Sequence, residues 1–234
     1  VQGFMASYCA KGGHIVGKSW VPLGTKDYSS VVSKIPGDID AVLVVLGGAD
    51  AVNFLTQYEQ AGGDKPMVGG TITVDQTVLN YKGKRRESLV GTPSAGPMAD
   101  SLDTPEWKKF VSDYKANFKD GFPSPSLFAF LYYISTKAAL EGLDAVKGDL
   151  SDGQKKYRAA LQKLVVKGPA GDIRIDENRN GVGTTYITEV VKNADGSLAS
   201  KVIKSVPNVS QTLGLSKAEF QKMGLGSRDV PNCP

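Results

Sequence analysis

The residues best placed to do chemistry follow a short apolar run. The segment 41–46 (AVLVVL) leads into Gly47 and Gly48, and Ala49 and Asp50 then begin a segment with helical periodicity. The pattern predicts a strand buried on both faces, a tight turn, and a helix whose N-terminus faces the carboxyl end of the strand. Open α/β sheets bind ligands at that edge. Asp50 has two open interpretations, because it also suits a capping role in its own helix.

Polar and aromatic side chains follow two other predicted elements. Thr71, Ile72 and Thr73 leave a second short strand predicted over 66–69, and the two hydroxyls either bond a ligand or are satisfied by backbone groups. Phe128 lies at the start of an apolar helix predicted over 127–143. Aromatic clusters on such helices are usually core, but the first turn of this helix can also project into a cleft. We therefore treat Thr71, Ile72 and Phe128 as candidate ligand contacts.

The motifs of the common cofactor-dependent and nucleophilic enzymes are missing from the sequence. There is no GxGxxG, Walker A or GxSxG pattern, and His14 is the single histidine, without a serine or carboxylate arranged around it. Catalysis by two carboxylates stays open, although no convincing pair follows the predicted strands. We expect no catalytic residue, no cofactor and no enzymatic activity.

Metal sites are equally poorly supported. Cys9, Cys233 and His14 cannot complete a tetrahedral zinc site without carboxylate help. Residues 176–181 match the first half of a calcium loop, but Ile187 stands where a bidentate Glu is required. The sequence therefore predicts a hairpin turn at 176–181 and no metal.

Composition narrows the class of protein further. The 234 residues are 41% hydrophobic and carry a net charge of +4 that is scattered along the chain, without the aromatic interleaving typical of nucleic-acid binding. No apolar run approaches the roughly 20 residues that span a bilayer. Cys9 and Cys233 suit an exported protein with one disulfide, or else two unpaired thiols.

The predicted elements run in the order βαβαβα, then helices, then a β-meander. We expect the first strand over 14–21, with Val16 and Trp20 in the core, and a helix started by Ser151 with Gln154 completing a capping box. The other predicted elements are listed by residue range: helices 4–10, 28–35, 104–118 and 217–223, and strands 89–92, 172–175, 184–191 and 198–206.

Four segments together resemble a known family. They are 27–62 (DYSSVVSKIPGDIDAVLVVLGGADAVNFLTQYEQAG), 65–79 (KPMVGGTITVDQTVL), 124–146 (SPSLFAFLYYISTKAALEGLDAV) and 168–198, whose GDIRIDENRNG is similar to a late hairpin of that family. No single motif is diagnostic, but the ordered set is fairly specific. The chain resembles the type I periplasmic solute-binding proteins of ABC importers, in the branched-chain amino-acid-binding subfamily.

The resemblance implies an α/β fold of two Rossmann-like lobes joined by a hinge, with the first lobe incomplete in this chain. It implies that residues 1–91 belong to the second lobe, 92–190 return to the first lobe, and 191–234 cross back to the second. It also implies a C-terminal fragment whose expected partner is a missing N-terminal part of the same protein, together with a small-molecule ligand and a membrane permease. The expected location is the periplasm, reached with a signal peptide.

Two departures from the family bear on the ligand. Amino-acid-binding relatives place a carboxylate where this chain has Thr71, and an aromatic side chain where it has Ala49. The resemblance makes Gly48, Ala49 and Asp50 one wall of the cleft, which Ala49 widens. A buried ammonium without a counter-charge is unfavourable, so we expect an aromatic or aliphatic carboxylate rather than an α-amino acid.

Other functions stay open at this point. A sensory ligand-binding domain of the same fold would feed a signalling partner, and a branched-chain amino acid is the alternative ligand. A Rossmann-like enzyme is the third possibility, which turnover of a bound ligand would distinguish from the other two. No nucleic-acid partner is expected.

Overall fold

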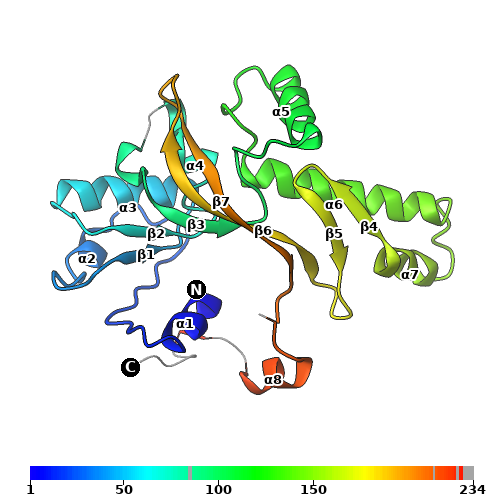
Figure 1. Cartoon of the computed structure of the whole chain (residues 1–234), viewed down its shortest axis with the longest axis horizontal. Coiled ribbons are helices and arrows are strands. Elements are labelled where there is room, and N and C mark those ends of the chain that lie inside the picture. Colours follow the sequence, from blue (N-terminus) through cyan, green and yellow to red (C-terminus); the bar gives the residue numbers. More distant parts are fainter. Residues whose placement is uncertain (84–85, 213, 225–226, 229–234) are drawn as a thin grey trace.

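The computed structural model describes the chain in four stretches, residues 1–83, 86–212, 214–224 and 227–228. Within them the chain builds a mixed α/β structure with a two-stranded and a five-stranded sheet. Figure 1 shows the small sheet and its helices on the left and the large sheet in the centre and right, with strand 93–96 of the large sheet next to strand 67–69 of the small one. In these stretches no helix has the length and apolar character needed to cross a membrane.

The smaller sheet forms because the apolar run 41–46 finds a parallel partner. β1 (Val42–Val44) pairs with β2 (Met67–Gly69), and Leu43 lies opposite Val68. Parallel strands need a crossover, which α3 (Gly48–Gln60) provides. Both strands therefore direct their carboxyl ends to the same edge, where the predicted site residues follow them.

The larger sheet is organised by one long strand. β6 (Gly181–Lys192) pairs antiparallel with β3 (Pro93–Gly96), with β5 (Gly171–Ile175) and, along most of its length, with β7 (Leu198–Val209). β4 (Val165–Gly168) adds to β5. β5 pairs only with the start of β6, whereas β3 and the turn to β7 lie farther along the strand. β6 and β7 therefore extend from the side of the molecule that holds β4 and β5 to the side that holds β3 (Figure 1).

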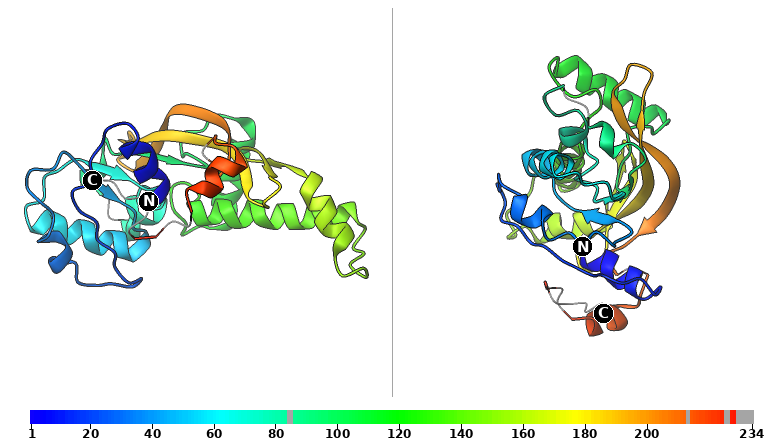
Figure 2. Two further views of the ribbon diagram at one scale, coloured as in Figure 1. Left: turned by 90° about the horizontal axis from the view of Figure 1, so that it is seen from below. Right: turned by 90° about the vertical axis from the view of Figure 1, so that its left-hand side faces the viewer.

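Three helices accompany the larger sheet. α5 (Pro105–Asn117) and α6 (Leu127–Ala145) are each capped by a hydroxyl, with Thr104 accepting from the amide of Trp107 and Ser126 from that of Ala129. α6 runs along the long axis of the molecule towards α7, as the left view of Figure 2 shows. Shorter elements complete the description: α1 (Gln2–Cys9), α2 (Ser29–Val32), α4 (Gln76–Leu79), α7 (Lys155–Lys163), α8 (Lys217–Lys222) and two 3-10 turns (Tyr81–Gly83 and Glu87–Leu89).

The buried apolar side chains form two separate clusters. The first cluster packs α3 and α4 against β1 and the tip of the β6–β7 hairpin; its largest members are Tyr28, Phe54, Leu55, Tyr58, Leu79, Leu89 and Leu198. The second cluster packs α5 and α6 against the larger sheet, and contains Met98, Ala99, Trp107, Leu127, Phe130, Ala170 and Tyr186. Side chains between the two clusters are polar, and they are described with the site below.

Most long elements lie where the sequence predicts them. Three short segments differ from the prediction. The segment predicted as a strand over 14–21 is irregular, and Val16 and Trp20 are 70% and 39% exposed rather than core. This prediction is wrong because β propensity is realised only when a partner strand is available. The strand expected over 89–92 lies instead at β3, and β4 was not predicted.

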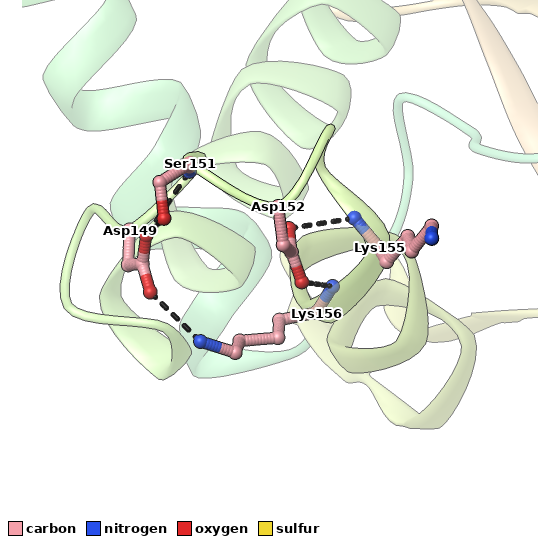
Figure 3. Close-up of polar contacts among 5 residues, drawn as sticks. All are labelled: Asp149, Ser151, Asp152, Lys155 and Lys156. Atoms are coloured by element: carbon pink, nitrogen blue, oxygen red, sulfur yellow. Dashed lines mark hydrogen bonds and ion pairs between the residues drawn. The ribbon is translucent and has the colours of Figure 1, made fainter.

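Helix α7 begins later than predicted, and a different residue caps it. Ser151 hydrogen-bonds to Asp149 instead of forming a capping box, whereas the Asp152 carboxylate accepts from the amides of Lys155 (2.9 Å) and Lys156 (3.0 Å), as Figure 3 shows. Lys156 Nζ lies 2.9 Å from the Asp149 carboxylate. The bonds from Ser151 and the charge of Lys156 hold the pKa of Asp149 well below its usual range, so this contact stays ionised through mildly acid pH.

Replacing Asp152 by alanine is expected to destabilise the start of α7. The variant leaves two amides of the first turn without their acceptor, which costs about 1 kcal/mol at a helix N-terminus. Urea denaturation followed by circular dichroism measures the change. Ser151→Ala is the matched control because Ser151 touches neither amide; equal losses in the two variants would contradict the capping role of Asp152.

Candidate functional site

The carboxyl ends of β1 and β2 are tied together by a threonine. Thr73 Oγ1 donates towards the carbonyls of Val44 and Leu46, both at 2.8 Å, and accepts from the amide of Leu46 at 3.2 Å. Thr73 is fully buried. Of the two roles left open for this hydroxyl, the structure therefore assigns the backbone role, in which Thr73 holds the edge that carries the site.

The next residues bring two predicted site segments into contact. Gly47 lies directly under the Ile72 side chain, since a Cβ added at Gly47 would stand 2.2 Å from Ile72 Cγ1. Gly48 has a φ of +50°, a left-handed conformation that favours glycine, and it begins α3. Gly48, exposed Ala49 and half-buried Ile72 thus lie at one sheet edge, as the sequence predicted for the turn.

Thr71 faces a different neighbour. Its hydroxyl donates to the Ala95 carbonyl at 2.5 Å, and its methyl group lies over Gly96 of β3. With its proton engaged by Ala95, the Thr71 hydroxyl retains only acceptor capacity for another group. Thr71 therefore joins the smaller sheet to the larger one and still offers an oxygen to the space beside it.

Asp50 turns away from the sheet edge. Its Oδ2 accepts from the amide of Gly24 at 3.0 Å. The pKa of Tyr28 is raised mainly by the burial of its hydroxyl and, to a smaller extent, by the negative charge of Asp50. The N-cap of α3 is Gly47, and among the described residues the helix has no side-chain cap. The capping role suggested for Asp50 is wrong, because Gly47 is the N-cap and Asp50 Oδ2 bonds the loop 22–28, 26 residues away. A ligand contact of Asp50 stays a prediction.

The loop is held by one face of α3. Besides Asp50, Asn53 Nδ2 donates to the Thr25 carbonyl at 3.4 Å, and Gln57 bonds both the Tyr28 amide (2.7 Å) and the Lys26 carbonyl (2.8 Å). The three side chains are spaced three and four residues apart, which places them on one helix face. The polar face of α3 is thus occupied by backbone groups of the loop 22–28. The part of the helix left to bind a ligand is its N-terminus, which no side chain of the described residues caps.

Phe128 lies in the first turn of α6 and is 44% exposed. The preceding residue, Leu127, donates its amide to Asp75 Oδ1 at 2.5 Å, which ties the start of α6 to the segment after β2. Phe128 does not line the cavity described next, whereas Leu127 does. The Phe128 side chain is therefore accessible near the site. Within the described part of the chain, the structure records no contact between it and the Gly47–Ile72 edge.

A small polar cavity lies between the two hydrophobic clusters. It measures about 20 Å³, sufficient for one water-sized guest. We call the polar side chains around it the polar junction: Asp75, Gln76, Ser94, Asp100, Ser124 and Ser200. Five of them line the cavity together with Thr71, Val74, Gly96, Met98, Leu127 and Thr188, while Ser124 lies beside Asp100.

The polar junction could not be identified from the sequence. Asp75 precedes α4 and resembles an ordinary helix cap, since it accepts from the Thr77 amide at 3.0 Å. Ser94 and Asp100 fall in a turn-rich segment, where isolated polar residues normally face solvent. Ser94 is buried where β3 pairs with β6, and half-buried Asp100 is covered by Ser200 of β7; neither pairing is visible in the local sequence.

A second, larger groove runs along α6 and α7. Its volume is about 790 Å³ and its walls are mainly apolar, including Ile134, Leu161 and Val166. None of the six predicted site residues lines it. The predicted Cys9–Cys233 disulfide stays a prediction, because Cys233 lies outside the described residues.

Comparisons with known proteins address the family. The sequence profile described as "Periplasmic binding protein" matches residues 1–196. "Leu/Ile/Val-binding protein homolog 6" of Brucella melitensis is 26% identical over 216 residues, which cover 87% of this chain and 52% of that protein. The chain therefore spans about half the length of the curated relatives it matches.

Solved structures share the fold. An ABC transporter substrate-binding protein from Sphaerobacter thermophilus is 28% identical, with a TM-score of 0.75 over 88% of this chain and 56% of that one. A solute-binding protein from Rhodopseudomonas palustris BisB5, in complex with 3,4-dihydroxybenzoic acid, is 25% identical, with a TM-score of 0.78 over the same shares. The α/β fold expected from the resemblance is confirmed by these similarities.

Proposed function

Because the chain belongs to the periplasmic binding protein family, as a type I solute-binding protein of ABC transporters, we propose that it binds a small organic acid and delivers it unchanged to a membrane permease. The observation that carries the choice of ligand is the N-terminus of α3. Its N-cap is Gly47, no side chain of the described residues caps it, and such an end favours a carboxylate. Ala49 leaves space beside it.

The other polar group at this edge supports the same class of ligand. Thr71 provides a neutral oxygen, not a carboxylate, so an α-ammonium group would lack a counter-charge there. The relative from R. palustris BisB5 holds an aromatic acid. We therefore propose an aromatic carboxylate, with its acid group at the start of α3 and with Ile72 and Phe128 offering apolar surface.

Titration calorimetry of the protein at its full natural length tests the proposal. We expect benzoate or a hydroxybenzoate to bind with a Kd of about 1 μM or lower, and L-leucine to show no heat of binding. Thr71→Asp adds a carboxylate beside the Ala95 carbonyl, and we expect it to weaken aromatic acid binding by about tenfold or more through charge repulsion. Tight leucine binding without aromatic acid binding would overturn the proposal in favour of a branched-chain amino acid.

The arrangement of lobes is also a proposal. We place residues 1–91 in the second lobe, 92–190 in the first, and 191–234 in the return to the second, with the polar junction at the crossings. The matched relatives are about twice as long as this chain. In the proposed arrangement the remaining part of the first lobe covers the 790 Å³ groove and supplies the opposite wall of the cleft, and the whole protein acts in the periplasm.

A further inference from the structure

The Asp100 carboxyl is bonded on one side only. Its Oδ2 accepts three hydrogen bonds, from Gln76 Nε2 (3.0 Å), the Ser200 amide (2.8 Å) and Ser200 Oγ (3.0 Å). Its Oδ1 is inaccessible to solvent and has no hydrogen-bond partner among the residues that the structure describes. Ionised carboxylates that are buried usually have both oxygens satisfied or a cation nearby, so the asymmetry requires an explanation.

The described residues that line the cavity offer acceptors for a proton but carry no positive charge. Within the described part of the chain, Ser124 Oγ and Ser94 Oγ are also buried without a hydrogen-bond partner, and Ser124 lies close enough to act on the Asp100 carboxyl. Asp75 is the other titratable side chain that lines the cavity among the described residues, and it accepts from Leu127 and Thr77. The groups that line the cavity from the larger sheet, Ser94, Gly96, Thr188 and Ser200, carry no charge.

We propose that the polar junction is a proton-binding site, in which Asp100 is a neutral carboxylic acid with its proton on Oδ1, donated to Ser124 Oγ. A carboxylic acid is one donor and several acceptors. Oδ2 then keeps its three bonds, Oδ1 gains a partner, and the cavity no longer holds two carboxylates without a cation. The one-sided bonding thus identifies the protonated atom.

The proton makes the junction sensitive to pH. Burial raises the pKa of Asp100, more than the hydrogen bonds from Ser200 and Gln76 lower it. A pKa raised on folding means that the folded state binds the proton more tightly. The corresponding stability is complete below the ordinary aspartate pKa and is lost as pH rises through the raised value. A rise in pH through that raised pKa therefore weakens the contact that Asp100 makes between α4, β7 and the loop before α6.

Thermal unfolding of the chain between pH 5 and pH 9 tests the proposal with Asp100→Asn. The amide is a neutral isostere: its oxygen can take the three bonds of Oδ2 and its nitrogen can donate to Ser124. We expect the Tm of the variant to exceed that of the wild type by about 2–4 °C at pH 8, because the neutral amide has no proton to lose as the pH rises. The difference should shrink towards pH 5.

The matched control is Asp103→Asn. Asp103 is exposed, pairs with Lys108, and has a pKa lowered by that lysine, so its removal should leave the alkaline loss of stability unchanged. Infrared spectra of the wild type, labelled with 13C-aspartate, provide a second measurement that needs no variant to fold. A protonated carboxyl band at neutral pH is expected. An Asp100→Asn variant less stable than the wild type at pH 8, or the absence of that band, would overturn the proposal. Neither measurement depends on the ligand.

Discussion

Trp107→Ala is expected to lower the free energy of unfolding by about 3–5 kcal/mol, the range for removing a large aromatic side chain from a packed core. Trp107 is 1% exposed, and its ring lies 5.6 Å from Phe110 and 6.4 Å from Phe130, measured between centroids. Its Nε1 also donates to the Asp100 carbonyl at 3.3 Å. The variant therefore removes the central side chain of the second cluster and one bond to the polar junction.

Urea denaturation followed by far-ultraviolet circular dichroism measures this loss without relying on tryptophan fluorescence. Phe118→Ala is the control, since Phe118 ends the same helix but is 61% exposed. We expect it to change stability by less than about 1 kcal/mol. A Trp107→Ala loss as small as that of the control would show that the second cluster does not depend on this residue.

Gly47→Ala is expected to damage the binding edge through a steric clash. The backbone of Gly47 is extended, with φ −134° and ψ 164°, so alanine is allowed there conformationally. The new Cβ would, however, stand 2.2 Å from Ile72 Cγ1 and 2.5 Å from its Cδ1. Overpacking of this kind costs about 1–3 kcal/mol, and the displaced Ile72 side chain moves the proposed wall of the cleft.

The clash can be tested by rescue. Ile72→Ala removes both atoms that the new Cβ would meet and leaves the Ile72 Cβ, 3.4 Å away. We expect the double variant Gly47→Ala/Ile72→Ala to be more stable than the sum of the single effects predicts, with the coupling measured in a double-mutant cycle. Calorimetry with benzoate should show binding lost in Gly47→Ala and partly restored in the double variant. Strict additivity would rule out contact between the two positions.

The sequence predicted helices and strands best where the pattern that defines them lies in neighbouring residues. The apolar run 41–46 and the helical spacing after Gly48 correctly indicated β1, the turn and α3. The expected burial of this strand on both faces is wrong, because Val42 and Leu43 are half-buried and Val45 is 42% exposed. Residues 14–21 show the opposite case, because they have strand composition but no partner strand in the described structure. β3 has the composition of a turn (PSAG), and it becomes a strand only because β6 pairs with it, with Pro93 at its first position, where proline is tolerated.

The site followed the same division. The edge that carries Gly48, Ala49 and Ile72 was predictable because strand ends and turns are written in neighbouring residues. The partners of Asp50, Thr71 and Thr73 were not, since each side chain bonds a backbone group 24 to 29 residues away. Asp100 depends on Ser200, 100 residues later. Hydrogen bonds over such separations leave no periodic signal.

The separations of these contacts also imply an order of assembly. The polar face of α3 closes loops of about 30 residues when it bonds the loop 22–28. Gln76 and Asn80 bond the Leu198 carbonyl across 122 and 118 residues. Closing the longer loops loses more chain entropy before any contact is gained. We expect the binding edge to fold early as a local unit, and the polar junction to close last, when β7 arrives and seals the first cluster.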